Sequence, residues 1–299
     1  MSAEGSFQRL LQRMQQLGFQ PSRRLGQNFL LDPTLHRVIA EAAGLGRTDV
    51  VLEVGPGLGF LTRELAQRAG HVVAVEIDPR LASILREELL AFAPEWAPVE
   101  VVEGDVLAPE DSVHAAALAA VRAARARLGG GFAVVANLPY AASGPFLARL
   151  PLLVEPPERA VLLVQRELAE RLTAAAGGRD YGSLPALLSG GYRIERLRKV
   201  GREVFRPRPQ VDSAIVRLVR NPDGPLWDLD PSARRLFSRW LRGVYAGRRK
   251  QLRSGLLLAA RQLGWPEPDP REEPLAARRI EELDAATCLQ LFSRQHRPF

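Results

Sequence analysis

The sequence contains very few of the residues that form disulfides or bind metal ions. Its one cysteine, Cys288, excludes an internal disulfide and is typical of a protein in a reducing compartment. The four histidines are scattered, and none stands near the cysteine at the spacing of metal ligands. No apolar run is long enough to span a membrane. We therefore expect a cytoplasmic protein with no membrane partner and no catalytic metal.

Lysine is also scarce, since Lys199 and Lys250 are the only ones in the chain. The charge is distributed unevenly: residues 28–192 have an excess of acidic side chains, whereas residues 1–27 and 193–299 have an excess of basic ones. A general preference for arginine would explain the missing lysines but not this segregation. The pattern predicts binding to a polyanion, and nucleic acid is the polyanion that it fits best.

Residues 50–166 alternate between short apolar, β-branched runs and helical stretches. The predicted strands cover residues 50–55, 72–76, 99–105, 132–136 and 160–164. Helical patterns follow the first strand, begin again at Pro79 and occupy residues 111–128. Residues 193–200 and 213–220 are expected to add a closing, hairpin-like pair of strands. Alternation of this kind predicts an α/β fold with a parallel, doubly wound sheet.

A cluster of structure-breaking residues, Asn-Pro-Asp-Gly-Pro over residues 221–225, marks a predicted domain boundary. Helical patterns follow it over residues 232–244, 248–263 and 284–292. We therefore expect two domains: residues 1–222, which include an N-terminal extension, and a small α-helical domain over residues 223–299. We expect the protein to be a monomer.

A glycine-rich turn, Gly55-Pro-Gly57-Leu-Gly59, leaves the first strand. Glycine allows positive φ and lets a ligand approach the backbone closely. Glu76 ends the second strand, at about the distance from the turn where an acid binds a ribose. Asp105 ends the third strand and could accept a hydrogen bond from an adenine amine. Either acid alone could be an ordinary strand-end residue, but together with the turn they indicate an adenine-containing cofactor.

The details of this turn favour S-adenosylmethionine over a dinucleotide. The glycine spacing is Gly-x-Gly-x-Gly, whereas dinucleotide sites have Gly-x-Gly-x-x-Gly. Glu53 precedes Gly55 by two residues and would lie near a cationic cofactor that has no pyrophosphate.

The tetrapeptide Asn137-Leu138-Pro139-Tyr140 directly follows the fourth predicted strand. Open α/β sheets bind their ligands at the carboxyl ends of their strands. The Asn137 amide can donate and accept hydrogen bonds, and the Tyr140 ring can stack on a planar group. Pro139 favours extended geometry at Leu138 and would hold its carbonyl in one direction. The stretch predicts a pocket for a flat, amine-bearing substrate; a turn with a core tyrosine is the alternative.

The chain resembles the bacterial ribosomal RNA adenine dimethylase family. The matching motifs lie in order over about residues 23–260: Gly26–Leu30, Glu53–Thr62, Val75–Asp78, Gly104-Asp105, Asn137–Tyr140, Tyr181-Gly182, Phe205–Ser213 and Arg248–Arg253. The resemblance implies a class I (Rossmann-like) methyltransferase domain with an appended helical domain. It also implies dimethylation of adenosines in small-subunit (16S) rRNA, with S-adenosylmethionine as the cofactor.

The resemblance further implies site residues. The expected cofactor-binding residues are Gln27, Asn28, Leu30, Gly55, Gly57, Gly59, Glu76, Asp105 and Asn137. The expected catalytic residues are Asn137, Leu138, Pro139, Tyr140 and Phe205. We expect Tyr140 to stack on one face of the target base and Phe205 on the other, although Phe205 could instead be a core residue. The expected RNA-binding residues are Arg23, Arg24, Arg206, Arg208, Arg248, Arg249, Lys250 and Arg253.

The residues themselves suggest how an adenine N6 amine would react. If the Asn137 side-chain oxygen and the Leu138 carbonyl accept its two hydrogens, the lone pair can turn toward the methyl group. Orientation then supplies much of the rate, and no dedicated general base is expected. One departure from the family pattern follows Tyr140, where Ala141 and Gly144 replace polar residues.

Other functions remain open from the sequence. A related dimethylase of large-subunit rRNA would share most of these motifs, although the long basic tail favours the small-subunit enzyme. A DNA adenine or protein glutamine methyltransferase could use the same tetrapeptide but would not explain residues 205–213. A ribosome-assembly or transcription factor could keep the fold without turnover, although the intact cofactor motifs argue against it.

Overall fold

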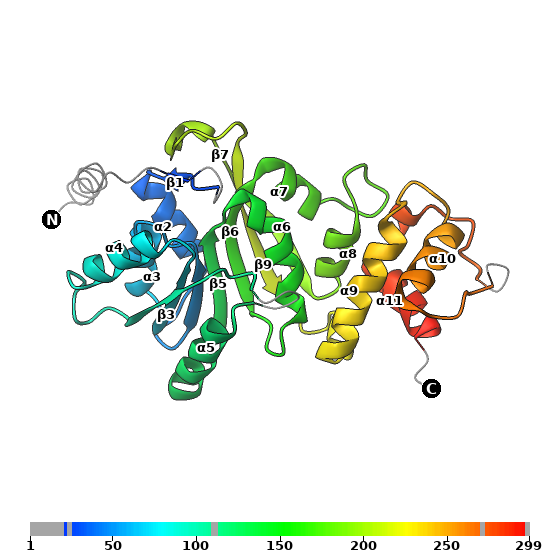
Figure 1. Ribbon diagram of the computed structural model, residues 1–299, viewed down its shortest axis with the longest axis horizontal. Helices are drawn as coiled ribbons and strands as arrows, with labels where there is room; N and C mark the ends of the chain where they lie inside the picture. The colour runs from blue at the N-terminus through cyan, green and yellow to red at the C-terminus, as the bar shows by residue number, and fades with distance from the viewer. Residues whose placement is uncertain (1–20, 23–25, 109–112, 270–272, 297–299) are drawn as a thin grey trace. The chain divides into compact units, whose positions relative to one another are not determined.

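The computed structural model describes residues 21–22, 26–108, 113–269 and 273–296 (Figure 1). These residues form two compact units. The first contains the described residues up to Phe146 with Pro157–Ala169 and Arg196–Leu218, and the second contains Leu147–Pro156, Glu170–Glu195 and the described residues from Val219 onward. The second unit therefore begins earlier in the sequence than the predicted boundary at residue 223. The reason is that Leu152 and Leu187 belong to the same apolar core as the C-terminal helices.

A seven-stranded sheet is the centre of the first unit. Its strands are β2 (Val50–Val54), β3 (His71–Glu76), β4 (Val99–Glu103), β5 (Phe132–Asn137), β6 (Arg159–Gln165), β7 (Tyr192–Val200) and β9 (Ser213–Arg220). Every residue of β2 and β3 is buried, which explains their continuous valine-rich runs. All five strands predicted before residue 166 are present, and so are the two predicted beyond it.

The strand order places one crevice at the middle of the sheet. The order is β4-β3-β2-β5-β6-β9-β7, and β2 pairs in parallel with both β3 and β5. After β2 the chain therefore adds β3 and β4 on one side of that strand, and it then crosses over to add β5 and β6 on the other side. Such a switch point opens a crevice beyond the carboxyl ends of the two central strands. Here the glycine turn follows β2, and Asn137 ends β5.

Four helices of the first unit pack against these strands (Figure 1). They are α2 (Pro33–Ala42), α3 (Phe60–Ala66), α4 (Pro79–Leu89) and α5 (Ala115–Leu128). Asp32 caps α2 by accepting two backbone N–H groups, and Asp78 caps α4 by accepting one; a proline follows each aspartate at the first helical position. Two further helices, α6 (Tyr140–Arg149) and α7 (Arg166–Leu172), directly follow β5 and β6.

A second, two-stranded sheet was not predicted. It consists of β1 (Phe29–Leu30) and β8 (Phe205–Arg206), which pair in antiparallel fashion with Leu30 opposite Phe205. Both of those side chains are buried in the cluster that also contains Val200 and Ile215. The pairing joins the segment before the main sheet to the segment between β7 and β9.

The second unit is mainly helical. It contains α8 (Ser183–Ser189), α9 (Pro231–Tyr245), α10 (Leu252–Leu263) and α11 (Ala285–Gln295), and short 3-10 turns cover Leu150–Leu152, Pro225–Asp228 and Ile280–Glu282. Its core is built around Phe237, Trp240 and Phe292, whose rings are in mutual contact. No helix in the described part of the chain is both long and apolar enough to cross a membrane.

The start of α10 differs from the prediction. The expected helix began at Arg248, but the observed helix begins at Leu252. Gln251 forms an isolated antiparallel bridge with Arg279, and that bridge holds it extended just before the helix. Residues 248–250 therefore lie in a turn and not on the helix.

Candidate active site

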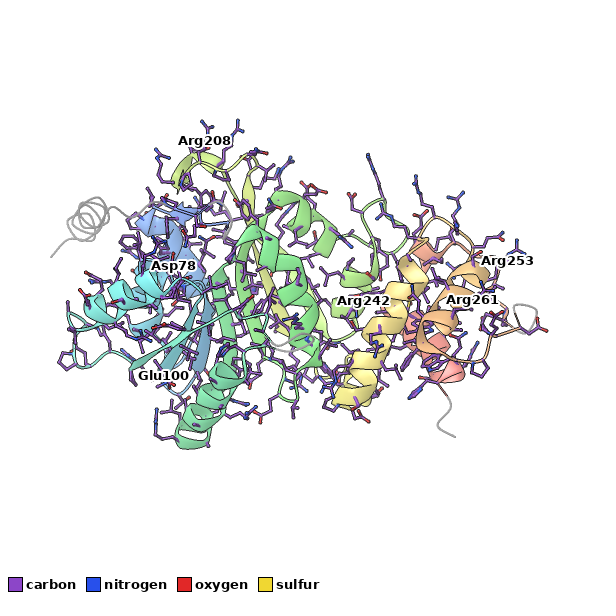
Figure 2. All side chains as sticks on the ribbon, in the orientation of Figure 1. Asp78, Glu100, Arg208, Arg242, Arg253 and Arg261 are labelled. Carbon is purple, nitrogen blue, oxygen red and sulfur yellow. The ribbon has the colours of Figure 1, made fainter. Side chains whose placement is uncertain are left out.

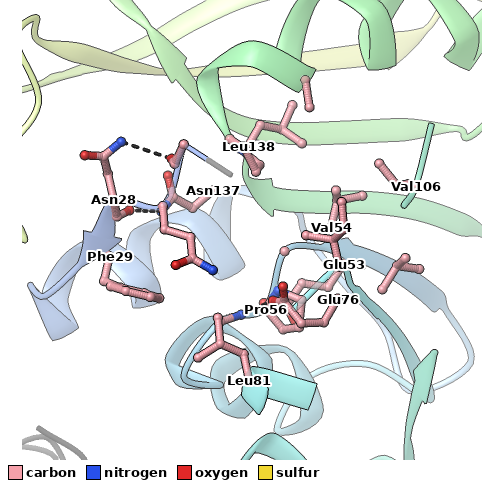
Figure 3. A pocket seen from close by; sticks show the side chains of 18 of the residues that line it. Asn28, Phe29, Glu53, Val54, Pro56, Glu76, Leu81, Val106, Asn137 and Leu138 are labelled. Atoms are coloured by element: carbon pink, nitrogen blue, oxygen red, sulfur yellow. Dashed lines mark hydrogen bonds between the residues drawn. The ribbon is translucent and has the colours of Figure 1, made fainter. Parts of the chain in front are cut away.

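A pocket of about 300 Å³ opens at the switch point between β2 and β5 (Figure 3). Its walls come from β1, the glycine turn, the ends of β3 and β4, and residues 137–142. Figure 3 shows Asn28 and Asn137 on one side of the pocket and Glu53 and Glu76 on the other. Eleven of the predicted site residues line it: Gln27, Asn28, Leu30, Gly55, Gly57, Glu76, Asp105, Asn137, Leu138, Pro139 and Tyr140.

The three glycines of the turn have different structural roles. Gly55 and Gly57 have positive φ, and a Cβ on Gly57 would lie 3.2 Å from the Phe29 ring. Gly59 also has positive φ but does not line the pocket. A Cβ there would lie 2.6 Å from the Leu85 side chain. The expected contact between Gly59 and the cofactor therefore stays a prediction. In this structure the small size of Gly59 allows α3 to begin close against α4.

Glu76 is held by the turn that it faces. One of its carboxylate oxygens accepts the Gly57 N–H at 3.0 Å and the other accepts the Asp78 N–H at 3.0 Å. Burial raises the pKa of this carboxyl, and the backbone donors oppose that rise. Each oxygen keeps a lone pair that can accept from a ligand hydroxyl.

Glu53 lies deeper in the pocket wall and is 1% exposed. One of its carboxyl oxygens is buried without a hydrogen-bond partner among the described residues. Burial raises the pKa of this carboxyl to about 8. The group is therefore protonated at neutral pH and can donate a hydrogen bond as well as accept one.

Asp105 and Gln27 lie at the pocket rim. One Asp105 carboxylate oxygen accepts the Leu107 N–H at 2.9 Å, and the other has no partner among the described residues. The Gln27 amide donates to Asp78 at 3.2 Å, which ties the segment before β1 to the start of α4.

The lining residues fit S-adenosylmethionine. Three acidic side chains face the pocket, and among the described residues that line it none is lysine or arginine. A dinucleotide would bring a pyrophosphate to a pocket whose described lining residues include no cation to neutralise it, whereas S-adenosylmethionine brings a cationic sulfonium and an ammonium group. The free oxygens of Glu53 and Asp105 can accept from donors of that cofactor.

The Asn137 amide is oriented by β1. Its nitrogen donates to the Asn28 carbonyl at 3.3 Å, and the Asn28 amide nitrogen in turn donates to the Gly26 carbonyl at 3.1 Å. The Asn137 side-chain oxygen has no partner among the described residues and lies in the pocket wall. The Leu138 carbonyl is likewise unpartnered there, while the Leu138 N–H is fixed by the Leu163 carbonyl at 3.1 Å.

Tyr140 is the first residue of α6 and is half-buried at the pocket. Its hydroxyl forms a 2.9 Å hydrogen bond with the hydroxyl of Ser213, the first residue of β9. Burial raises the pKa of Tyr140, so the phenol is neutral at physiological pH. Tyr140 thus lines the same pocket as Asn137 and Leu138.

The segment that departs from the family pattern forms the first turn of α6. The hydroxyl of the buried Ser143 donates to the Pro139 carbonyl at 3.0 Å, which fixes this turn. Ala141 and Ala142 line the pocket, and a Cβ on Gly144 would meet open space. The side chains of Ala141 and Ala142 therefore make this edge of the pocket apolar.

The structure contradicts the expected stacking role of Phe205. Its side chain is 0% exposed and does not line the pocket. The pairing of β8 with β1 places the ring in the apolar cluster with Leu30 and Ile215. Phe205 is therefore a core residue, which was the alternative interpretation.

Several residues in or near the pocket were not among the predicted site residues, including His36, Phe60 and Ser213. His36 and Phe60 both line the pocket and stack with ring centroids 5.6 Å apart. Burial lowers the pKa of His36 to about 4, so the imidazole is neutral. His36 belongs to the buried face of α2 with Leu35 and Ile39, and that helical period was the available signal. Ser213 ends the Phe205–Ser213 motif, but its contact with Tyr140 could not be predicted because the two residues are 73 positions apart.

The predicted RNA-binding residues lie in different environments. Arg206 and Arg208 are exposed on and after β8, and Arg249, Lys250 and Arg253 are exposed around the start of α10. Figure 2 labels Arg208 and Arg253. The Arg248 guanidinium donates to the Tyr181 carbonyl at 3.0 Å, so this residue supports the fold of the second unit. Arg23 and Arg24 lie outside the described residues. Within the part of the chain that is described, no group of three or more potential ligands could hold a metal ion.

The chain is similar to known proteins over most of its length. The family model for ribosomal RNA adenine dimethylase matches residues 18–277. The Nocardia farcinica protein named ribosomal RNA small subunit methyltransferase A is 40% identical over 288 residues, which cover 93% of this chain and 90% of that protein.

Two solved structures are similar over most of their length. A dimethyladenosine transferase from Plasmodium falciparum has a TM-score of 0.65 and 25% identity, covering 88% of this chain and 95% of that one. The 23S rRNA methyltransferase ErmE has a TM-score of 0.55 and 30% identity, covering 90% and 100%. The chain belongs to the ribosomal RNA adenine dimethylase family, whose model matches most of its length and whose fold it has.

Proposed function

We propose that this protein transfers methyl groups from S-adenosylmethionine to the N6 amines of adenosines near the 3′ end of 16S rRNA. Two adjacent adenosines would each receive two methyl groups during maturation of the small ribosomal subunit in the cytoplasm. The name of the Nocardia farcinica relative supports the small-subunit substrate. That relative is 40% identical to this chain, whereas the 23S enzyme ErmE is 30% identical.

One observation supports the target amine most directly. The Asn137 amide nitrogen is occupied by the Asn28 carbonyl, so its oxygen is left as a free acceptor in the pocket wall. The Leu138 carbonyl is a second free acceptor one residue away. Two neighbouring acceptors suit an exocyclic amine, which has two hydrogens to donate.

This arrangement would activate the amine by orientation. Accepting both hydrogens at Asn137 and Leu138 aims the nitrogen lone pair away from those two residues. S-adenosylmethionine, when bound in the pocket, supplies an electrophilic methyl group. Holding the reacting atoms in line contributes several kcal/mol, and the proton leaves to solvent after transfer. The mechanism therefore requires no histidine or carboxylate base.

The target base must leave its helix to reach the pocket. The Tyr140 ring is the stacking surface for one face of the adenine, because it is half-buried at the pocket and neutral. The side chains of Ala141 and Ala142 add an apolar edge. With Phe205 buried in the core, the second face of the adenine is not covered by that ring.

Residues 198–208 form an exposed basic surface beside the pocket, which we call the basic ridge. Its members are Arg198, Lys199, Arg202, Arg206 and Arg208. Arg206 is opposite Phe29 in the β1–β8 ladder, and Phe29 lines the pocket. The guanidinium of Arg202 donates to the Gln210 carbonyl and that of Arg206 to the Glu203 and Phe205 carbonyls. These partners are uncharged, so the contacts leave the positive charges of both arginines in place. The ridge suits the phosphates that flank the target adenosine.

The proposal is tested by incubating the purified protein with methyl-labelled S-adenosylmethionine and unmethylated small subunits. Naked 16S rRNA, large subunits and DNA are parallel substrates. Nuclease digestion and chromatography should yield N6,N6-dimethyladenosine from the small-subunit rRNA. Label confined to large-subunit rRNA would instead identify an enzyme with the specificity of ErmE, and label on DNA or protein would contradict the proposal.

A further inference from the structure

We propose that Ser213 is a positioning residue for methyl transfer, acting through the hydroxyl of Tyr140. The proposal rests on the function proposed above. Ser213 does not line the pocket, and its side chain is 0% exposed. Its hydroxyl is 2.9 Å from the Tyr140 hydroxyl, which is the polar end of the ring that faces the base.

The backbone of Tyr140 fixes the Cα end of the side chain but not the hydroxyl end. A hydrogen bond to the hydroxyl is therefore needed to hold the ring in one orientation. Tyr140 begins α6 directly after Pro139, so its Cα is set by the end of β5 and by the first helical turn. The ring can still turn about its χ angles at the pocket edge. A hydrogen bond to its far end removes this freedom and sets the plane on which the adenine stacks.

Ser213 can do this because it is itself held rigidly. It begins β9, which lies next to β6 in the main sheet. The preceding residue, Asp212, is fixed twice: its carbonyl accepts the Arg166 N–H at 2.9 Å, and its carboxylate accepts the Arg202 N–H at 3.3 Å. The start of β9 is thus held beside the end of β6, and this fixes the position of the Ser213 hydroxyl.

The same segment also reaches the other end of the tetrapeptide. Residues 205–213 begin with β8, which pairs with β1. The residue before β1, Asn28, provides the carbonyl that orients the Asn137 amide. Residues 205–213 therefore support Asn137 through Asn28 at one end and Tyr140 through Ser213 at the other. Arg206 and Arg208 belong to this segment, so RNA bound at the basic ridge would contact the piece of chain that positions both catalytic side chains.

The test uses Ser213→Ala, Tyr140→Phe and the double variant in the full chain. We expect each single change to lower kcat on small subunits by roughly tenfold or more, since a small misplacement of a stacked substrate is costly. The cofactor Kd should stay unchanged. The double variant should be no slower than the slower single variant, because both changes break the same contact. Losses that multiply in the double variant would overturn the proposal.

A second readout does not depend on any substrate. The chain has only four tyrosines, so 19F NMR of fluorotyrosine-labelled protein gives a small set of signals, and Tyr140→Phe identifies the one from residue 140. Ser213→Ala should shift or broaden that signal. Ser238→Ala, a change at another buried serine, should leave it and kcat unaltered. An unchanged Tyr140 signal in Ser213→Ala would contradict the positioning role even if the rRNA substrate proved to be different.

Discussion

At the scale of single residues, the three carboxyl groups of the pocket differ in burial and in hydrogen-bond partners. Glu76 is buried but receives two backbone N–H groups, whereas Glu53 is buried with an unpartnered oxygen. Asp105 lies beyond the end of β4 and keeps one free oxygen. The sequence predicted the position of Glu76 and Asp105 at strand ends. It could not predict that Glu53 is protonated, because that depends on burial by residues from other elements.

The raised pKa of Glu53 predicts a pH dependence of stability. The folded-state pKa of about 8 lies above the ordinary value of 4.5. The protonated group therefore favours the folded state fully below pH 4.5, and this contribution is lost as the pH rises toward 8. Between these values the free energy of unfolding should fall with rising pH by on the order of 1 kcal/mol per unit.

Glu53→Gln should remove most of the fall in the free energy of unfolding with rising pH. Urea unfolding of the ligand-free protein at several values from pH 5 to pH 8 measures this slope. The part of the slope due to Glu76, whose pKa is also raised by burial, should remain. Glu95→Gln changes an exposed carboxylate and is the matched control, with the slope of the unchanged protein. Equal slopes in all three proteins would show that Glu53 is ionised in the folded state.

At the scale of elements, the main sheet followed from the sequence, but the β1–β8 sheet did not. The apolar runs of β2, β3 and β5 have a strong local pattern and are bounded by glycine, proline or acidic residues. β1 and β8 have two residues each and are paired across more than half of the chain. No local pattern distinguishes such short strands. For the same reason Phe205 could be read either as a stacking ring or as a core residue.

The core position of Phe205 predicts the behaviour of Phe205→Leu. Loss of ring volume in a fully buried site should lower the free energy of unfolding by about 1–3 kcal/mol. Turnover per folded molecule should stay within a few-fold of the unchanged protein at temperatures well below Tm. Phe237→Leu, in the core of the second unit, is the control for a loss of stability alone. A large fall in kcat with an unchanged Tm would show that the ring contacts the base in the reactive complex.

At the scale of the whole molecule, the charge pattern and the fold agree. The acidic central part of the sequence forms much of the sheet and the acidic wall of the cofactor pocket. Exposed basic side chains lie on the basic ridge in the first unit and around α10 in the second. The sequence predicted a nucleic-acid partner from this segregation. The sequence could not show which arginines are free to contact RNA and which hold the fold together, as Arg248 does by donating to the Tyr181 carbonyl.

The central claim is that Asn137 orients the adenine amine, so that its loss impairs methyl transfer far more than cofactor binding. The most direct measurement compares Asn137→Ala with the unchanged protein in two assays: calorimetric binding of S-adenosylmethionine, and dimethyladenosine formed per small subunit. We predict cofactor binding within a few-fold of normal and a loss of methyl transfer of a hundredfold or more, on the order expected when a reacting group is misplaced. Normal turnover in Asn137→Ala would contradict the account.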